Sequence, residues 1–169
     1  MIYLKRVKSQ QAFTLIELVL SMGIFSLLSA IGLASYVQFN RRQILLTSTR
    51  ALVNDLRMVQ SRANSGEKAI GLAADCLGDL QDYKVVVTSL PQITYRLYIE
   101  CASSPAPILI KEVTMPEVIS KVSGFDSIKF KPLRQGVETS PQDQYTLILN
   151  AFGVSKTITA GKAGEITFE

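Results

Sequence analysis

The hydrophobic residues of this chain concentrate near its N-terminus. Residues 18–40 form a run of 23 positions without a charged side chain, and 18–37 consist mostly of Leu, Val, Ile, Ala, Gly, Ser and Phe. At about 1.5 Å per residue, a helix over this run is about 35 Å long, whereas the hydrocarbon core of a bilayer is about 30 Å thick. The pattern therefore predicts a transmembrane helix over 18–37.

The helical pattern continues beyond the uncharged run. Hydrophobic residues recur at intervals of three, four and seven positions, at Leu45, Leu52, Val53, Leu56, Val59 and Ala63. This spacing predicts a helix with one buried face. The first strong stop signal is Ser65-Gly66, so we expect one continuous helix over 13–64, about 78 Å long.

Five arginines occupy other positions of this predicted helix, at Arg41, Arg42, Arg50, Arg57 and Arg62. Their spacing does not keep them on one face, which favours a solvated helix surface. Arg41 and Arg42 also suit contact with anionic lipid or with a DNA backbone.

From residue 83 the pattern changes from helical to extended. Runs rich in β-branched and aromatic residues predict strands over 83–88, 93–99, 108–113, 127–131, 145–151, 154–159 and 165–168. Turn residues separate several of these runs, at 150–153 and 160–164. We therefore predict an α+β chain, in which a long N-terminal helix packs against a C-terminal antiparallel β-rich head over 65–169.

The amino-acid composition limits the classes of function that this chain can have. Of 169 residues, 47% are hydrophobic and 19% charged, and 18 Lys and Arg against 14 Asp and Glu give a net charge of +4. Such a chain is not disordered. It contains no histidine, which excludes Ser-His-Asp and Cys-His catalysis and the usual His-containing zinc sites. We expect a non-enzymatic protein without a cofactor or a metal.

A secretory signal peptide is one alternative to a retained membrane span. It would use Gly32-Leu33-Ala34 as a small-x-small cleavage site, and the mature chain would start at Ser35. The apolar run, however, exceeds the usual length of about 7–15 residues. Glu17 also lies at its leading edge, where a carboxylate opposes insertion. Both features favour the retained span.

Glu17 has two compatible interpretations. Thr14-Leu15-Ile16-Glu17 has the S/T-x-x-E form of a capping box, with Thr14 as the N-cap. A charge in a membrane segment also costs on the order of 2.5–3.5 kcal/mol, so its carboxylate should have a partner.

The segment Gln10-Gln11-Ala12-Phe13-Thr14-Leu15-Ile16-Glu17-Leu18, after a basic leader, resembles the signal of type IV prepilins and type II secretion pseudopilins. The resemblance implies that a prepilin peptidase removes residues 1–12 by cutting between Ala12 and Phe13. Phe13 would then carry the N-methylated amine. The family usually has Gly before the cut, whereas this chain has Ala12.

The resemblance also implies a role for Glu17 in assembly. The amine that cleavage exposes at Phe13 and the Glu17 carboxylate of a neighbouring subunit would each lack a counter-ion in lipid without the other. Their pairing would set a repeating offset and so build a helical filament. The expected partners are other pilin or pseudopilin subunits, the peptidase and methyltransferase, an inner-membrane assembly platform and lipid, with the head outside the cytoplasm.

A second resemblance concerns most of the remaining chain. Residues 52–63 look like the helix of GspH/FimT-type minor pseudopilins, and the order of the last hydrophobic strands is similar to that group. The resemblance implies a minor subunit at the initiation complex or the tip of a filament, in a pilus, a secretion pseudopilus or a competence system.

Three further residue sets are candidate sites. Cys76 and Cys101 enclose a loop of about 25 residues, and the sequence leaves open a disulfide or two buried thiols. Asp75, Asp79 and Asp82 lack the spacing of a calcium loop, so a solvated polar loop is favoured. Ser65-Gly66-Glu67-Lys68 matches S-x-x-K, but no S-D-N or K-T-G follows, so we interpret the match as chance.

Two alternative functions remain. A DNA-binding subunit of a competence pilus would use Lys156 and Lys162, near the C-terminal turns. A membrane-anchored extracytoplasmic enzyme is the other alternative, and the absence of histidine disfavours it.

Overall fold

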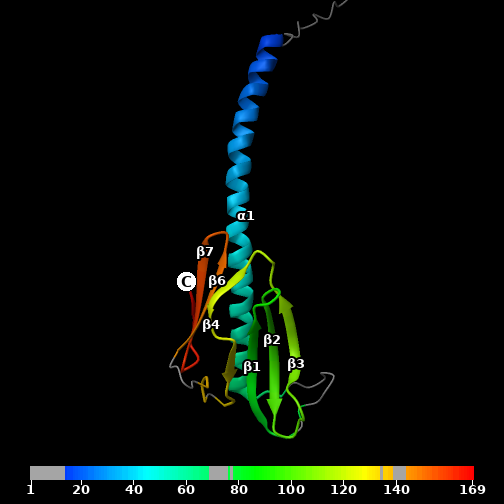
Figure 1. Ribbon diagram of the computed structural model, residues 1–169, viewed down its shortest axis with the longest axis vertical. Helices are drawn as coiled ribbons and strands as arrows, with labels where there is room; N and C mark the ends of the chain where they lie inside the picture. The colour runs from blue at the N-terminus through cyan, green and yellow to red at the C-terminus, as the bar shows by residue number, and fades with distance from the viewer. Residues whose placement is uncertain (1–13, 69–75, 77, 134, 139–143) are drawn as a thin grey trace, which may run out of the picture. The chain divides into compact units, whose positions relative to one another are not determined.

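The computed structural model describes residues 14–68, 76, 78–133, 135–138 and 144–169. The chain divides into two units, Met1–Phe39 and Asn40–Glu169. Helix α1 (Leu15–Ser65) contributes to both units, and all strands belong to the second (Figure 1).

Both ends of α1 carry the backbone signals that their sequences predict. Thr14 precedes the helix, and its carbonyl oxygen accepts hydrogen bonds from the amides of Glu17 (3.1 Å) and Leu18 (3.2 Å). At the other end Gly66 has a φ of 65°, which glycine adopts without strain. The amide of Gly66 donates to Ala63 and that of Glu67 to Arg62, the pattern of a Schellman cap.

Within the described residues, eight strands form two four-stranded antiparallel sheets. The first sheet has the order β3-β2-β1-β5, with β1 (Leu80–Thr88), β2 (Thr94–Cys101), β3 (Ile108–Thr114) and β5 (Ser127–Phe130). The second sheet has the order β4-β6-β7-β8, with β4 (Ser120–Gly124), β6 (Gln144–Ala151), β7 (Val154–Gly161) and β8 (Ile166–Phe168).

The core lies between the C-terminal half of α1 and both sheets. All six hydrophobic residues predicted to line the buried face of the helix are at most 1% exposed. Alternate residues of the strands complete the same cluster, for example Val85 and Leu97 from the first sheet and Leu149 and Ile158 from the second. Figure 1 shows this half of α1 beside the two sheets.

The prediction of an α+β chain with a long N-terminal helix and an antiparallel β-rich head is confirmed. Strand ends differ from the predicted ones by up to three residues, most at β1, which begins at Leu80 rather than residue 83. Strand β4 was not predicted, because Ser-Lys-Val-Ser-Gly contains a single β-branched hydrophobic residue. The prediction of a solvated loop around Asp82 is wrong, since Asp82 lies within β1.

Candidate functional site

Residues 15–39 of α1 expose every large hydrophobic side chain that they contain. The fifteen side chains are those of Leu15, Ile16, Leu18, Val19, Leu20, Met22, Ile24, Phe25, Leu27, Leu28, Ile31, Leu33, Tyr36, Val37 and Phe39. Within the described residues, α1 is the single helix that is long and apolar enough to cross a bilayer. A contiguous apolar surface of this size is typical of segments that lipid or other protein chains cover.

Glu17 is the one charged residue between positions 14 and 40, and its side chain is exposed in the first turn of α1. Its amide lies 3.4 Å from the Thr14 hydroxyl oxygen, which places Thr14 as the N-cap. Among the described residues, none forms a hydrogen bond or an ion pair with the Glu17 carboxylate. The positive end of the helix dipole stabilises a negative charge in this turn, and both carboxylate oxygens can still accept hydrogen bonds from a partner.

Two hydroxyl groups within the apolar segment have partners inside the helix. Ser21 donates to the carbonyl oxygen of Leu18 (2.9 Å), and Ser26 donates to that of Gly23 (2.8 Å). These bonds leave neither hydroxyl group dependent on water, which suits an apolar environment. Ala12 and Phe13, the predicted cleavage and methylation site, lie outside the described residues.

A partly buried ionic cluster, which was not predicted from the sequence, joins α1 to the first sheet. The Asp55 carboxylate is 8% exposed and accepts hydrogen bonds from the Tyr95 hydroxyl (2.8 Å) and the Lys111 ammonium group (2.8 Å). Burial, and then the hydrogen bond to Asp55, raise the pKa of Tyr95. The helical spacing of Asp55 with Leu52 and Leu56 was the one signal of its burial in the sequence.

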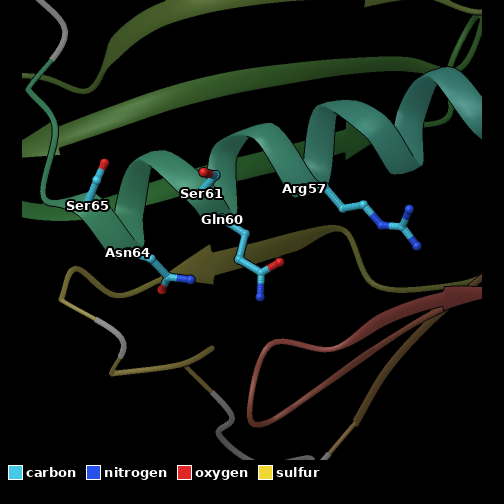
Figure 2. A pocket seen from close by; sticks show the side chains of 5 residues that line it. All are labelled: Arg57, Gln60, Ser61, Asn64 and Ser65. Atoms are coloured by element: carbon cyan, nitrogen blue, oxygen red, sulfur yellow. The ribbon is translucent and has the colours of Figure 1, made fainter.

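A polar groove of about 440 Å³ follows the C-terminal turns of α1 (Figure 2). Its lining residues are Arg57, Gln60, Ser61, Asn64 and Ser65. Arg57 donates to the carbonyl oxygen of Ile166 (3.0 Å), and Gln60 donates to that of Gly164. These two side chains therefore tie the helix to the start of β8 and to the turn between β7 and β8.

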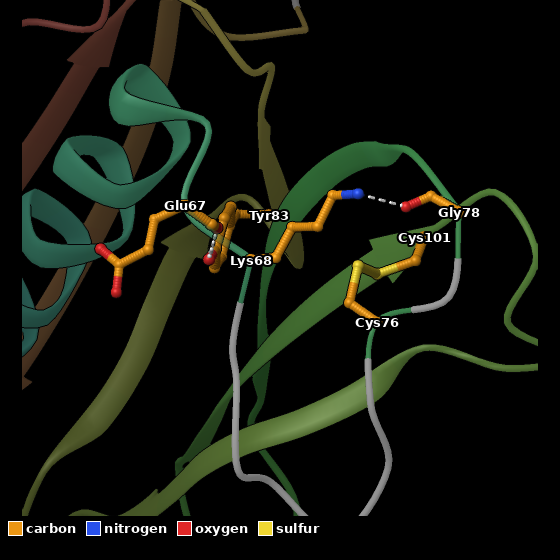
Figure 3. Close-up of a disulfide and its surroundings, with 6 residues drawn as sticks. All are labelled: Glu67, Lys68, Cys76, Gly78, Tyr83 and Cys101. Atoms are coloured by element: carbon orange, nitrogen blue, oxygen red, sulfur yellow. Dashed lines mark hydrogen bonds between the residues drawn. A yellow bond between two sulfur atoms is a disulfide. The ribbon is translucent and has the colours of Figure 1, made fainter.

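Cys76 and Cys101 are joined by a disulfide bond, with their Cα atoms 5.6 Å apart (Figure 3). The bond ties the segment before β1 to the end of β2. Near it, the Tyr83 hydroxyl donates to the Glu67 carbonyl oxygen (2.6 Å), and Lys68 donates to that of Gly78 (2.6 Å). Together these contacts hold the chain that leaves α1 against the first sheet.

The same contacts separate the residues of the S-x-x-K match. The Ser65 hydroxyl donates to the carbonyl oxygen of Arg62 (3.0 Å), whereas Lys68 donates to Gly78. Neither side chain is bonded to the other, so the geometry offers no activated serine.

The predicted DNA contacts are not brought together. Lys156 lies on β7 opposite Leu149, on the face that packs towards the core, and it is half-buried. Lys162 is exposed in the turn after β7, six residues further along. At about 3.3 Å per strand residue, roughly 20 Å of chain separates them.

Of the three aspartates, Asp75 lies outside the described residues. The other two, Asp79 and Asp82, have different surroundings. Asp79 is exposed before β1, and its carbonyl oxygen accepts a hydrogen bond from Ala102 (2.9 Å). Asp82 is half-buried, 3.6 Å from the ammonium group of Lys129, and burial raises its pKa. The described part of the chain contains no group of three His, Cys, Asp or Glu residues that could hold a metal ion.

One comparison with known families gives a match. The model of the prokaryotic N-terminal methylation motif matches residues 7–33. No curated protein and no solved structure matches the chain. The motif indicates a type IV pilin- or pseudopilin-like precursor, and it implies processing by a prepilin peptidase and other pilin-like subunits as partners. The motif and the exposed apolar helix are consistent with single-pass membrane anchoring.

Proposed function

We propose that this chain is a non-enzymatic minor pilin or pseudopilin. In this proposal it inserts in the inner membrane with its head outside the cytoplasm. It then assembles into a type IV pilus or a type II secretion pseudopilus, as an initiation or tip subunit. The observation that carries the proposal is a helix segment with exposed apolar side chains and a single acid, Glu17, in its first turn, inside the methylation motif.

The apolar composition of the helix segment suits both of its proposed environments, the membrane and the filament. Before assembly, lipid covers the apolar side chains of residues 15–39, and in a filament the same side chains pack on neighbouring helices. Transfer from lipid to protein gives little hydrophobic gain, because both surroundings are apolar. A polar contact that lipid does not offer would therefore favour the assembled state.

Glu17 suits such a contact. Peptidase cleavage would leave a positively charged amine on Phe13 of each subunit, and a Glu17 carboxylate of an adjacent subunit can accept its hydrogen bonds. Each subunit offers one acid and one amine, so the contact is heterologous and propagates rather than closing into a dimer.

The first test is the mass and N-terminal sequence of the chain extracted from membranes of its own host. We expect a chain that has lost residues 1–12 and that starts at a methylated Phe13. A chain that retains Met1, or that starts at Ser35, would overturn the proposal.

The second test is Glu17→Ala, with Glu67→Ala as the matched control, because Glu67 is an exposed acid that follows the other end of α1. We expect Glu17→Ala to reach the membrane in unchanged amount and to be depleted from sheared filaments or pseudopili. Glu67→Ala should assemble normally. Normal assembly of Glu17→Ala would remove the proposed role of the acid.

A further inference from the structure

We propose that the start of the second unit, the turn before β4 and the turn between β6 and β7 form a lipid-headgroup contact site. This inference rests on the proposed membrane insertion of α1. The contact site consists of Arg41, Arg42, Val118 and Phe152, and its occupant is the surface of a bilayer that contains anionic lipid.

The depth of Arg41 along the helix carries the first step. Arg41 directly follows the uncharged run, and it lies about 35 Å along the helix axis from Leu18. The hydrocarbon core is about 30 Å thick, so a helix that spans it from Leu18 brings Arg41 and Arg42 to the headgroup level. Both arginine side chains are exposed and free to contact lipid phosphates.

An aromatic residue is fixed at the same level. The guanidinium carbon of Arg41 lies 4.9 Å from the centre of the Phe152 ring, within the range of a cation–π contact. Figure 1 shows the turn between β6 and β7, which contains Phe152, beside α1. Segments that lie at a membrane surface combine Lys and Arg with apolar residues such as Phe and Leu, which enter the boundary between headgroups and acyl chains.

Val118 supplies a second exposed apolar side chain, in the turn before β4. Ser120 pairs with Asn150, and its hydroxyl lies 3.3 Å from the Asn150 carbonyl oxygen. Val118 lies two residues before Ser120 and Phe152 two residues after Asn150, so in this antiparallel pair both turns are at the same end of the second sheet. Their side chains are 44% and 45% exposed. This end of the sheet therefore presents two exposed apolar side chains, with the Arg41 guanidinium group against the Phe152 ring.

Phe152 occupies a turn position whose backbone conformation is unfavourable for a bulky residue. Phe152 and Gly153 form a two-residue hairpin loop in which both φ angles are positive, 54° and 79°. Such loops favour Asn-Gly, and a bulky residue with positive φ is strained. A solvent-exposed Phe in this position contributes little to the core, which fits a contact outside the chain.

The test uses the absence of tryptophan from the chain. Phe152→Trp gives the full-length protein a single tryptophan, and the protein is reconstituted in vesicles of phosphatidylcholine and phosphatidylglycerol with plain or brominated acyl chains. We expect a blue-shifted emission in plain vesicles and the loss of most of the emission in brominated ones. Val118→Trp is a second reporter and should respond in the same way.

Leu133→Trp is the matched control. Leu133 is also an exposed hydrophobic residue with positive φ (56°), but its amide donates to the Ala63 carbonyl oxygen. Ala63 is 22 residues beyond Arg41, about 33 Å along the helix axis. Brominated lipid should leave the emission of this variant unchanged.

The contribution of the two cations is tested with Arg41→Gln and Arg42→Gln. In anionic vesicles, each variant should lower the ratio of lipid-contacting to lipid-free contact sites about fivefold.

Vesicle flotation separates the possible failures. If the protein floats with the vesicles but neither reporter is quenched, the membrane anchor stands and the headgroup contact is overturned. The emission could instead shift to the blue as protein density rises, without quenching by bromine. That result identifies a second copy of the chain as the occupant, and it also overturns the headgroup contact. Failure to float overturns the anchor as well as this inference.

Discussion

Asp55 shows how one buried charge can fix a helix on a sheet. Its carboxylate accepts hydrogen bonds from Tyr95 of β2 and Lys111 of β3, so three elements meet at one side chain. We expect Asp55→Ala to lower the free energy of unfolding by roughly 3 kcal/mol, because it leaves the buried Tyr95 hydroxyl without its acceptor. Urea unfolding of the detergent-solubilised protein, followed by circular dichroism, measures the change.

Glu112→Ala is the control for Asp55→Ala. Glu112 also pairs with a cation, Arg96, but both side chains are exposed, 43% and 38%. An exposed pair contributes only about 0–1 kcal/mol, so this variant should unfold nearly as the unmodified protein does. Equal losses in the two variants would show that the Asp55 cluster does not stabilise the fold.

Two buried tyrosines predict a loss of stability at alkaline pH. Burial raises the pKa of both Tyr83 and Tyr95 above the ordinary value of 10.0. Above that value the unfolded chain loses these protons before the folded chain does, so the free energy of unfolding should fall as the pH rises to about 11 and beyond. Urea unfolding over this pH range, with Tyr95→Phe as the comparison, measures the decrease in the free energy of unfolding. The decrease should be smaller in Tyr95→Phe, and an unchanged decrease would exclude Tyr95 as a cause.

At the scale of elements, the hairpin of β1 and β2 is closed at its open end by the disulfide between Cys76 and Cys101. A crosslink over 25 residues is expected to stabilise the fold by roughly 3 kcal/mol, through the lower entropy of the unfolded chain. We expect the double variant Cys76→Ser and Cys101→Ser to lose about this amount in urea unfolding. Reducing agent should destabilise the unmodified protein equally and leave the double variant unchanged, and an effect on both would point to another cause.

The helix and most strands could be predicted from sequence because their signals are local. The buried face of α1 follows from side-chain spacing, and β1, β2 and β6 follow from dense β-branched and aromatic runs. Strand β4 has almost no such signal, and its pairing with β6 comes from the tertiary fold. Likewise, the partners of Asp55 are 40 and 56 residues away in the chain, so no local pattern identifies them.

The candidate site also combines features that a local sequence pattern can predict with one that depends on the tertiary fold. The apolar helix segment, Thr14 and Glu17 were identified from a short contiguous motif, because length, charge and capping are local properties. The contact of Arg41 with Phe152 joins residues more than a hundred positions apart. It could not be predicted, because it depends on where the β6–β7 turn meets the helix.

At the scale of the whole molecule, the hydrophobic core and the exposed apolar segment lie in different parts of the chain. Every residue of the hydrophobic core lies at or beyond Leu45, and within the described residues 15–39 no large hydrophobic side chain is buried. A fragment over Asn40–Glu169 therefore retains the whole described core. We expect it to be soluble without detergent, to unfold in one cooperative transition, and to match the full chain in free energy of unfolding within about 1 kcal/mol.

Sedimentation and urea unfolding of this fragment beside the full chain in detergent measure both properties. The full chain should sediment as micelle-bound or associated protein, because its exposed apolar segment requires a cover. The same fragment carrying Asp55→Ala should lose as much stability as the full-length variant does, since Asp55 and its partners are all retained. A fragment that is unfolded or aggregated would show that residues 15–39 also stabilise the head, and that anchoring and folding are not separable in this chain.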